Sequence, residues 1–242
     1  MSNYITGRNP VRELLRAGNR TVSKILLSNQ SRGSAIEEII KLAKEKQIPM
    51  HHVPPERFNK LNIENNQGVA AEISAVDYLN IYELWNKVKN EAKPLIVILD
   101  EIEDPHNLGA IIRSAVTLGA NGIVIGKWRS VGLTETVART SAGASEHIPI
   151  ARVSNISDCI NVLKKSGVWI IGTETNTKPL ATESFSFPLA IVIGSEGKGL
   201  RRLVKERCDD LVAIPQTSKI SSLNASCAAS IVLYEIFKQK TK

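Results

Sequence analysis

Five short apolar runs, rich in β-branched residues, recur from residue 95 onward at intervals long enough to hold a helix between them. They are LIVIL (95–99), GIVIG (122–126), VWIIG (168–172), LAIVIG (189–194) and LVAIP (211–215). Strands without polar alternation need cover on both faces, and a parallel sheet between layers of helices provides it. The pattern therefore predicts an α/β domain that extends from about residue 91 to the end of the chain.

The first 75 residues predict a separate, smaller α/β unit. A helix is predicted to begin at Pro10 and to stop at Gly18, because proline favours the first helical position and glycine the residue after the last. Apolar residues from Ile36 to Ala43 recur at helical spacing and predict a second helix. Short strands are expected at KILLS, MHHV and GVAAEIS. The chain is thus expected to divide into residues 1–76, a linker with a leading helix at 77–90, and residues 91–242.

The composition excludes two broad classes of protein. With 43% hydrophobic and 23% charged residues, the chain fits neither a disordered nor a membrane protein. No stretch approaches the ~20 consecutive apolar residues of a membrane span, and the first residues lack the apolar core of a secretory signal. Cys159, Cys208 and Cys227 lie far apart without a C-x-x-C pair, which favours neither a disulfide framework nor a zinc site. We expect a cytoplasmic protein without a bound metal.

Basic side chains exceed acidic ones, and the net charge is +7. This balance suits a polyanionic partner, although many proteins that never bind nucleic acid share it. The excess is concentrated at the start, where residues 1–75 hold 11 Lys and Arg against 7 Asp and Glu. Arg8, Arg12 and Arg16 are the candidate RNA-binding residues, and the last two lie one helical turn apart. A solvated helix face is the alternative interpretation.

The first unusual strand end is DEIEDPHNLGAIIRSA (100–115). Ligands of parallel sheets bind beyond the carboxyl ends of the strands, so residues at this place are site candidates. Asn107 is expected to cap the following helix, and Gly109 to leave its first turn open. Arg113 follows one turn later on the same face, near a helix end that favours anions. The segment predicts a phosphate or carboxylate site, with a plain helix cap and a surface arginine as the alternative.

The second unusual strand end is IGSEGKGL (193–200), where a strand runs into three glycines. Gly194, Gly197 and Gly199 let the backbone turn sharply and let a ligand approach its amides. Their order is neither the G-x-G-x-x-G of dinucleotide sites nor a phosphate-binding Walker loop. Glu196 is a poor neighbour for phosphates and suits a cofactor with cationic amino and sulfonium groups. A plain tight turn is the alternative.

The third unusual strand end is IPQTSKISSLNASCAAS (214–230). Pro215 ends a strand, a polar loop follows, and Ser222 or Asn224 stands where a helix of small residues begins. The small side chains from Ala225 to Ala229 let backbones pack closely. Taken alone, this loop is most simply interpreted as the start of a well-capped core helix.

Together and in this order, the three segments resemble the signature motifs of the SpoU-type branch of the SPOUT RNA methyltransferases. That family carries N-x-G-x-x-x-R, then a strand ending in G-x-E-x-x-G, then I-P-M-x-G-x-x-x-S-L-N-x-S. The matching residues are Asn107, Gly109 and Arg113, then Gly194, Glu196 and Gly199, then Ile214, Pro215, Ser222, Leu223, Asn224 and Ser226. ITGRNPVRELL and NQGVAAEIS are similar to the small RNA-binding domain of the bacterial subgroup that methylates a guanosine of 23S ribosomal RNA.

The resemblance implies a fold, a cofactor and partners. The expected fold is α/β, with a small ribosomal-protein-like N-terminal domain and a SPOUT catalytic domain whose parallel sheet ends in a deep C-terminal trefoil knot. The implied cofactor is S-adenosyl-L-methionine, and the implied assembly is a homodimer. The implied reaction is methylation of a ribose 2′-hydroxyl in structured RNA, with a guanosine of 23S ribosomal RNA or its precursor as the favoured substrate.

The resemblance also implies which residues act. The cofactor contacts fall on Gly194, Ile214 and Leu223, and the catalytic set falls on Asn107, Arg113, Glu196, Ser222 and Asn224. A guanidinium with a pKa above about 12 is a poor proton acceptor. We therefore expect Arg113 to bind the phosphate beside the target ribose and to stabilise the developing alkoxide. The other four residues are expected to order the loops and the ribose.

Two positions depart from the family pattern. Gln216 stands where methionine is usual, and Ser218 stands where glycine is usual. If that glycine serves a positive φ, Ser218 is strained or the loop is rebuilt, and cofactor binding is weakened. Three other functions stay open: ribose methylation of transfer RNA, a non-catalytic RNA-binding or ribosome-assembly factor, and a nucleotide-cofactor oxidoreductase on an ordinary doubly wound sheet.

Overall fold

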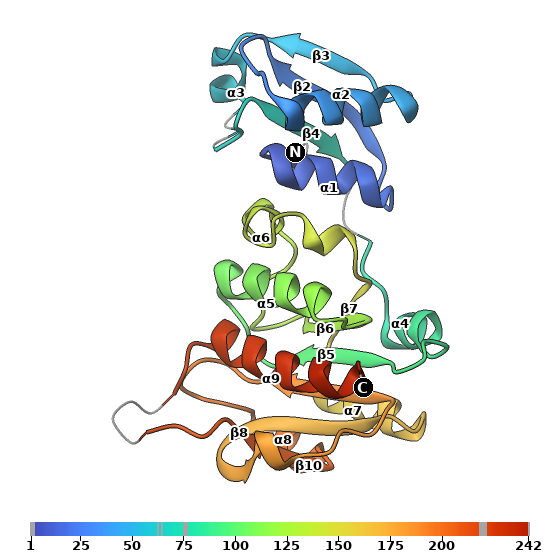
Figure 1. Cartoon of the computed structure of the whole chain (residues 1–242), viewed down its shortest axis with the longest axis vertical. Coiled ribbons are helices and arrows are strands. Elements are labelled where there is room, and N and C mark those ends of the chain that lie inside the picture. The colour runs from blue at the N-terminus through green and yellow to red at the C-terminus, as the bar shows by residue number, and fades with distance from the viewer. Residues whose placement is uncertain (1–2, 62, 64, 75–76, 218–221, 242) are drawn as a thin grey trace. The chain divides into compact units, whose positions relative to one another are not determined.

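Backbone contacts divide the chain into two compact units, and Figure 1 labels most of their elements. The structure, a computed structural model, describes residues 3–61, 63, 65–74, 77–217 and 222–241. The first unit holds residues 1–77 and 133–147, and the second holds residues 78–132 and 148–242. The division into domains predicted from the sequence stays a prediction. The segment 133–147 was not expected to contact the N-terminal residues.

The first unit is built on a mixed four-stranded sheet with the order β1-β4-β2-β3. Strand β4 is antiparallel to both of its neighbours, and β2 and β3 are parallel. The elements of this unit are β1 (Asn3–Thr6), α1 (Arg8–Ala17), β2 (Val22–Ser28), α2 (Ser34–Glu45), β3 (Met50–Val53), α3 (Glu56–Lys60), β4 (Val69–Ile73), α6 (Glu135–Thr140) and the 3₁₀ turn η1 (Ala144–Glu146).

Both helices predicted in the N-terminal part are confirmed, although α1 begins at Arg8 and Pro10 is its third residue, not its first. Gly18 ends α1 with a φ of 65°, and its N–H donates to the carbonyl of Leu14. Because this left-handed conformation is open to glycine at little cost, the residue type explains where the helix stops. Helix α2 buries Ile36, Ile39 and Ala43 against the sheet, as their spacing predicted. The short elements β1 and α3 were not predicted.

Contacts far apart in sequence attach the segment 133–147 to the first unit. Thr6 Oγ1 donates to Glu135 Oε1 at 2.6 Å, and Arg20 pairs with Glu146 at 3.2 Å. The Glu146 carboxyl is buried, and this desolvation raises its pKa, against the lowering effect of the Arg20 charge. Neither pair could be predicted from a periodic pattern in the sequence.

The second unit is built on a six-stranded, all-parallel sheet with the order β10-β8-β9-β5-β6-β7. An α/β fold with such a sheet is what the apolar runs predicted. The elements of this unit are α4 (Ile81–Val88), β5 (Leu95–Leu99), α5 (Pro105–Thr117), β6 (Gly122–Gly126), β7 (Ile150–Val153), α7 (Ile156–Lys165), β8 (Trp169–Pro179), the 3₁₀ turn η2 (Leu180–Thr182), β9 (Leu189–Ile193), α8 (Arg202–Arg207), β10 (Asp210–Ala213) and α9 (Ala225–Lys240).

The five apolar runs form strands β5, β6, β8, β9 and β10. Every residue of β5, β6 and β9 is buried, so these strands are covered on both faces. Strand β7 was missed, because this edge strand has only four residues and its sequence IARV includes the half-buried Arg152. Strand β8 is longer than its apolar run and continues to Pro179.

Helices pack on the sheet in two groups. Apolar side chains of α4, α7 and α8 form one core with the strand residues that face them. Helices α5 and α9 lie side by side (Figure 1), and the hydroxyls of Ser114 and Ser230 join them at 2.8 Å. No helix in the described part of the chain is both long enough and apolar enough to span a membrane.

Because all six strands are parallel, their carboxyl ends meet at one edge of the sheet. Strand β5 lies between β9 and β6, so the loops after these three strands are direct neighbours. The N–H of Asp100, just beyond β5, donates to the carbonyl of Ile193 at the end of β9. The first two of the unusual loops therefore start side by side.

Candidate functional site

The side chain of Asn224 joins the three loops that the sequence singled out. Its Oδ1 caps α9 by accepting from the N–H of Ser226 at 3.0 Å and from the Ser226 hydroxyl at 2.7 Å. Its Nδ2 donates to Asn107 Oδ1 and to Glu196 Oε2, both at 3.0 Å. Of the two candidates for the helix start, Asn224 is thus the cap. One amide connects the loops after β5, β9 and β10.

The prediction that Asn107 caps α5 is wrong. Asp104 is the N-cap, and its carboxylate accepts from the N–H groups of His106 and Asn107 at 3.1 and 3.3 Å. Pro105 follows it at the first helical position, where proline is favoured and a missing N–H costs nothing. Asn107 therefore lies in the first turn, and its side-chain oxygen accepts from Asn224.

The turn after β9 leaves no space for a side chain at Gly194. A Cβ there would lie 2.4 Å from the carbonyl carbon of Gly199 and 2.7 Å from the N–H nitrogen of Leu200. Gly197 and Gly199 both have positive φ, and the N–H of Gly199 donates to the carbonyl of Ser195 at 3.0 Å. The backbone folds back on itself, as the three glycines predicted.

A cavity of about 370 Å³ lies between this turn and the start of α9. Its volume falls in the ~300–1,000 Å³ range that is usual for small-molecule sites. It is lined by the residues proposed to bind the cofactor, Gly194, Ile214 and Leu223, together with Glu196, Gln216 and Ser222. Ser218 lies outside the described residues.

A second cavity, of about 270 Å³, shares a wall with the first. Ser195, Glu196, Lys198 and Ala225 line both of them, while Asn107 and the loop of residues 101–104 line only the second. Asn224 lines neither cavity, but its amide is hydrogen-bonded to Glu196, which lines both, and to Asn107, which lines only the second. The chain therefore has two adjoining cavities, and the larger one has the size of a cofactor site.

Sequence reasoning missed the wall that β8 contributes to the first cavity. Thr173 and Glu174 line it, and Glu174 is held by Lys205 at 3.1 Å. With Glu196, this side chain gives the cavity two carboxylates, which suit a ligand that carries positive charge. The signal was available in the sequence, because Thr173 and Glu174 directly follow the apolar run VWIIG.

Sequence reasoning also missed an ion pair between the buried Asp100 and the partly exposed Arg201. The side chain of Asp100 is fully buried and accepts from the backbone N–H of Arg201 at 2.9 Å. It also accepts from the guanidinium of Arg201, at 2.8 Å from Nε and 2.7 Å from Nη2. Both guanidinium contacts are made to Oδ1 and the backbone N–H donates to Oδ2, so three charge-assisted contacts hold the two residues together. They tie the end of β5 to the segment that follows the glycine turn.

Two predicted catalytic residues line neither cavity, and they differ in their contacts: Asn224 is hydrogen-bonded to the lining residues Asn107 and Glu196, whereas Arg113 contacts no lining residue through a hydrogen bond in the described part of the chain. Arg113 is exposed on α5. It lies six residues beyond Asn107, or about 9 Å along the helix axis at 1.5 Å per residue. Within the described residues it makes no hydrogen bond and no ion pair. The catalytic role of Arg113 stays a prediction.

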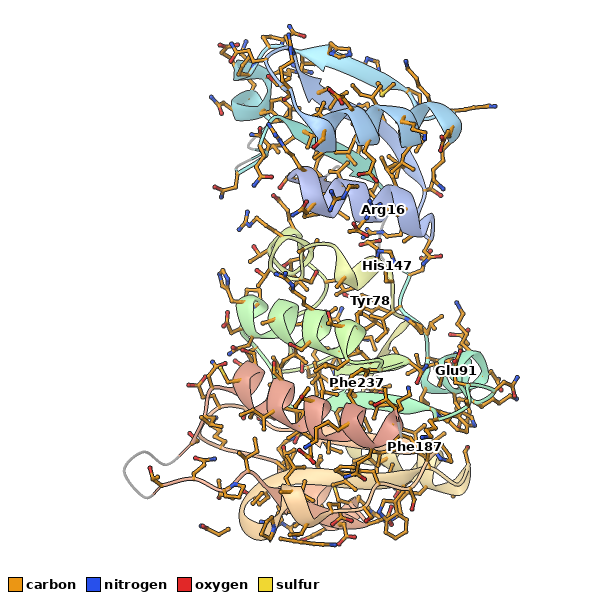
Figure 2. The ribbon with its side chains drawn as sticks, viewed as in Figure 1. Arg16, Tyr78, Glu91, His147, Phe187 and Phe237 are labelled. Atoms are coloured by element: carbon orange, nitrogen blue, oxygen red, sulfur yellow. The ribbon has the colours of Figure 1, made fainter. Side chains whose placement is uncertain are left out.

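The predicted RNA-binding arginines of the first unit differ in their partners. Arg12 and Arg16 both pair with Glu13 and Glu38, at distances from 2.5 to 3.8 Å. Glu13 Oε2 also lies 3.0 Å from His147 Nε2. Arg16 and His147 can be found by their labels in Figure 2. Arg8 donates to the backbone oxygen of Gln67 and has no acidic partner among the residues that the structure describes. RNA binding by these three residues stays a prediction.

Comparison with known proteins matches both parts of the chain. The model of the SpoU rRNA Methylase family matches residues 94–234, and the model for RNA 2′-O ribose methyltransferase substrate binding matches residues 4–79. The YacO protein of Bacillus subtilis (strain 168), whose name places it among TrmH family tRNA/rRNA methyltransferases, is 43% identical over 98% of this chain and 96% of its own length. A Staphylococcus saprophyticus protein named for the same family is 43% identical over 98% of this chain and 95% of its own length.

Solved structures agree with the family models. The SpoU methyltransferase AviRb from Streptomyces viridochromogenes, in complex with AdoMet, superposes with a TM-score of 0.83 and 25% identity over 99% of this chain and 90% of its own. The AdoMet-bound rRNA methyltransferase from Sinorhizobium meliloti gives a TM-score of 0.80 and 25% identity, over 98% of this chain and 87% of its own. The fold and the glycine-turn cavity thus define a SpoU-type methyltransferase with its own substrate-binding domain.

The chain belongs to the SpoU/TrmH family of RNA 2′-O-ribose methyltransferases. Its cofactor is S-adenosylmethionine, which SpoU methylases use and which is bound in the two similar structures. The residues present fit this cofactor. The glycine turn makes a backbone cradle that a Cβ at Gly194 would fill, and Glu174 and Glu196 offer carboxylates to a cationic ligand.

Replacing Asn224 by Asp separates its two roles. Aspartate caps a helix as well as asparagine does, so the thermal stability of Asn224→Asp should stay close to that of the wild type. It cannot donate, and its charge would lie beside Glu196. We therefore expect a clear loss of methylation at preserved stability. Asn155→Asp is the matched control, since Asn155 caps α7 away from both cavities. Equal activity of the two variants would contradict the joining role of Asn224.

Proposed function

We propose that this protein methylates the ribose 2′-hydroxyl of a guanosine in 23S ribosomal RNA or its precursor. The observation that carries the proposal is the bridge that Asn224 makes between Glu196, which lines a cofactor-sized cavity, and Asn107, which lines the cavity beside it. The likeness to an rRNA methyltransferase over 98% of the chain supports the ribosomal substrate. Transfer RNA is the runner-up, because the names of the curated relatives include both RNA classes.

The two cavities suggest how the reaction is arranged. Gly194, Ile214 and Leu223 hold the cofactor, which supplies an electrophilic methyl group when bound. Asn107 and Glu196 face the second cavity, where the ribose has to lie for in-line transfer. The hydroxyl oxygen accepts the methyl group and its proton passes to water, so negative charge develops on this oxygen as the proton leaves. A positioned cation stabilises that charge, and Arg113 is the residue we assign to this task.

We propose that the protein works as a homodimer and that Arg113 serves the site of the partner subunit. Arg113 lies outside both cavities of its own chain, yet α5 packs directly against α9. Helix α9 leaves Ile231 and Tyr234 exposed, at 42% and 55%, one turn apart on one face. Two such faces can cover each other in a two-fold contact. We also propose that the catalytic domain contains the deep trefoil knot. We expect the protein to act in the cytoplasm, where its RNA substrate is.

Charge on this face of α9 should separate the subunits. We expect the double variant Ile231→Glu, Tyr234→Glu to have the mass of a monomer in light scattering and to lose methylation, because buried unpaired carboxylates cost several kcal/mol at an interface. Tyr82→Glu is the matched control, since Tyr82 is 64% exposed on α4. The assembly proposal fails if the double variant stays dimeric, or if the wild type is itself a monomer.

The substrate proposal is tested by mapping ribose methylation in cells. Total RNA from cells with and without the gene is compared position by position, in ribosomal and in transfer RNA. We expect one guanosine of 23S ribosomal RNA to lose its 2′-O-methyl group without the gene. Loss of a transfer RNA methyl group instead would establish the runner-up. No difference in either RNA would favour the non-catalytic RNA-binding factor.

A further inference from the structure

The loop that follows β6 exposes an aromatic ring among basic side chains. Trp128 is 68% exposed, which is the largest fraction among the large hydrophobic residues that the structure describes as exposed. The ammonium nitrogen of Lys127 lies 5.3 Å from the centroid of its ring. Tryptophan combines a large apolar face with an attraction for cations, so a ring left in water beside a lysine suits a flat, anionic partner.

The turn that carries Trp128 has little freedom of conformation. A Cβ at Gly126 would lie 2.9 Å from the hydroxyl oxygen of Ser130 and 3.1 Å from the backbone oxygen of Trp128 itself. Arg129 has a φ of 51°, in the left-handed region that few non-glycine residues adopt. The chain therefore folds tightly around this turn. A ring on such a turn is presented in a defined place.

The turn is bonded to the wall of the second cavity. Arg129 Nη1 contacts Glu101 Oε1 at 3.3 Å, and the N–H of Val131 donates to the carbonyl of Ile102 at 3.0 Å. Glu101 and Ile102 both line that cavity. Strands β5 and β6 are parallel neighbours, so the two loops leave the sheet at the same edge. Trp128 thus belongs to a loop attached to the place proposed for the ribose.

Cations outnumber carboxylates around Trp128, although Glu101 pairs with Arg129. Lys127 and Arg129 flank it in sequence and are both exposed. Arg152 adds a third cation, because its Nη2 donates to the backbone oxygen of Lys127 at 3.3 Å and its guanidinium lies 5.2 Å from the ring of Tyr78. Lys127 has no acidic partner within the described part of the chain. Basic side chains around an aromatic ring are the combination that binds unpaired nucleotides, through phosphates and base faces.

We propose that Trp128 stacks on a nucleobase of the RNA substrate close to the target nucleotide, while Lys127 and Arg129 contact its phosphates. This inference rests on the proposed function, since the ligand is the RNA whose ribose is methylated. The stacking would be a contact between the RNA and the catalytic unit. It would act in addition to the RNA contact expected from the N-terminal unit. It also requires that the substrate be unpaired at this base, because a stacked duplex does not offer a free base face.

Steady-state kinetics with 23S ribosomal RNA fragments tests the stacking. We expect Trp128→Ala to raise the KM for RNA by about tenfold, the loss that follows when one base loses its aromatic partner, and to leave kcat little changed. Trp128→Phe should keep most of the RNA affinity, because it retains a ring. Trp169→Ala is the matched control, since Trp169 is 44% exposed but lies at the amino end of β8, away from the site.

Fluorescence gives a readout that does not depend on activity. In the double variant Trp85→Phe, Trp169→Phe, Trp128 is the only tryptophan that remains in the chain. We expect RNA to quench its emission with the same dissociation constant that filter binding gives, and double-stranded RNA to quench it less.

The outcomes separate this inference from the proposed function. An active wild type whose KM for RNA does not change in Trp128→Ala overturns the stacking and leaves the methyltransferase standing. Unchanged emission on adding RNA overturns the stacking as well, whether or not the RNA is methylated. If Trp128→Ala alters the mass of the assembly at equal RNA affinity, Trp128 belongs to a protein interface and the proposal is wrong.

Discussion

Arg113→Ala should lower the rate of methyl transfer by about 10²- to 10³-fold, the loss that follows removal of a donor to a developing oxyanion. Cofactor affinity should change little, because Arg113 lines neither cavity of its own chain. Arg113→Lys should restore little activity, since an ammonium cannot reproduce the planar, bidentate guanidinium. Single-turnover rates and calorimetric titration with S-adenosylmethionine measure the two quantities. Arg202→Ala, which removes an exposed arginine of α8, is the control.

The pH profile distinguishes stabilisation of charge from proton transfer. If Arg113 only stabilises the alkoxide, Arg113→Ala keeps the wild-type profile at a lower rate. A changed profile would assign the proton to Arg113, against its pKa above about 12. A rate equal to that of the wild type would remove Arg113 from the mechanism.

Complementation tests whether Arg113 acts across the dimer. When Arg113→Ala is co-expressed with a variant that cannot bind cofactor, each mixed dimer keeps one site free of both defects if the arginine acts on the partner subunit. About a quarter of the wild-type activity is then expected from random pairing. If Arg113 acts within its own chain, every site carries one defect and no activity returns.

Gly194→Ala is the substitution expected to abolish cofactor binding. Its Cβ would lie 2.4 to 2.7 Å from backbone atoms of Gly199 and Leu200, which no rotation of a side chain can relieve. Forcing one methyl group into such packing costs about 1–3 kcal/mol or more. The turn has to open, and the first cavity loses the wall that the turn provides. We expect the affinity for S-adenosylmethionine to fall by about 100-fold or more, since each tenfold loss of affinity corresponds to about 1.4 kcal/mol.

The control for this change is a glycine elsewhere in the chain at which an added Cβ would meet open space. Gly167 has a φ of 82°, and a Cβ there would meet no atom within 4 Å, at the end of α7 and away from both cavities. Gly167→Ala should lower thermal stability slightly and leave calorimetric titration with the cofactor unchanged. Equal cofactor affinities for Gly194→Ala and the wild type would show that the turn does not shape the cofactor site.

The parallel sheet could be predicted because burial on both faces leaves a direct trace in sequence. The runs LIVIL, GIVIG and LAIVI are apolar throughout, and they form the fully buried strands β5, β6 and β9. The edge strand β7 left no such trace, since Arg152 interrupts it. The glycine turn could be predicted for a similar reason, because only glycine fits at Gly194.

Contacts between side chains could not be predicted in the same way. Nothing in the spacing of Asp100 and Arg201 shows that an ion pair joins them, and nothing near Glu146 points to Arg20. The cap of α5 was assigned to Asn107 because asparagine is a good cap, although Asp104 directly before Pro105 is the better placed residue. The same polar residue can cap a helix or join two loops, and only the fold decides between them.

Transfer of a methyl group from the cofactor to a ribose oxygen of RNA can be measured directly. The purified protein is incubated with S-adenosylmethionine and unmethylated 23S ribosomal RNA, and the RNA is then digested to nucleosides for mass spectrometry. We expect 2′-O-methylguanosine at one site per RNA, and none with Gly194→Ala. A methyl group on a base, or no transfer to ribosomal or transfer RNA, would contradict the assignment of this chain as a ribose methyltransferase.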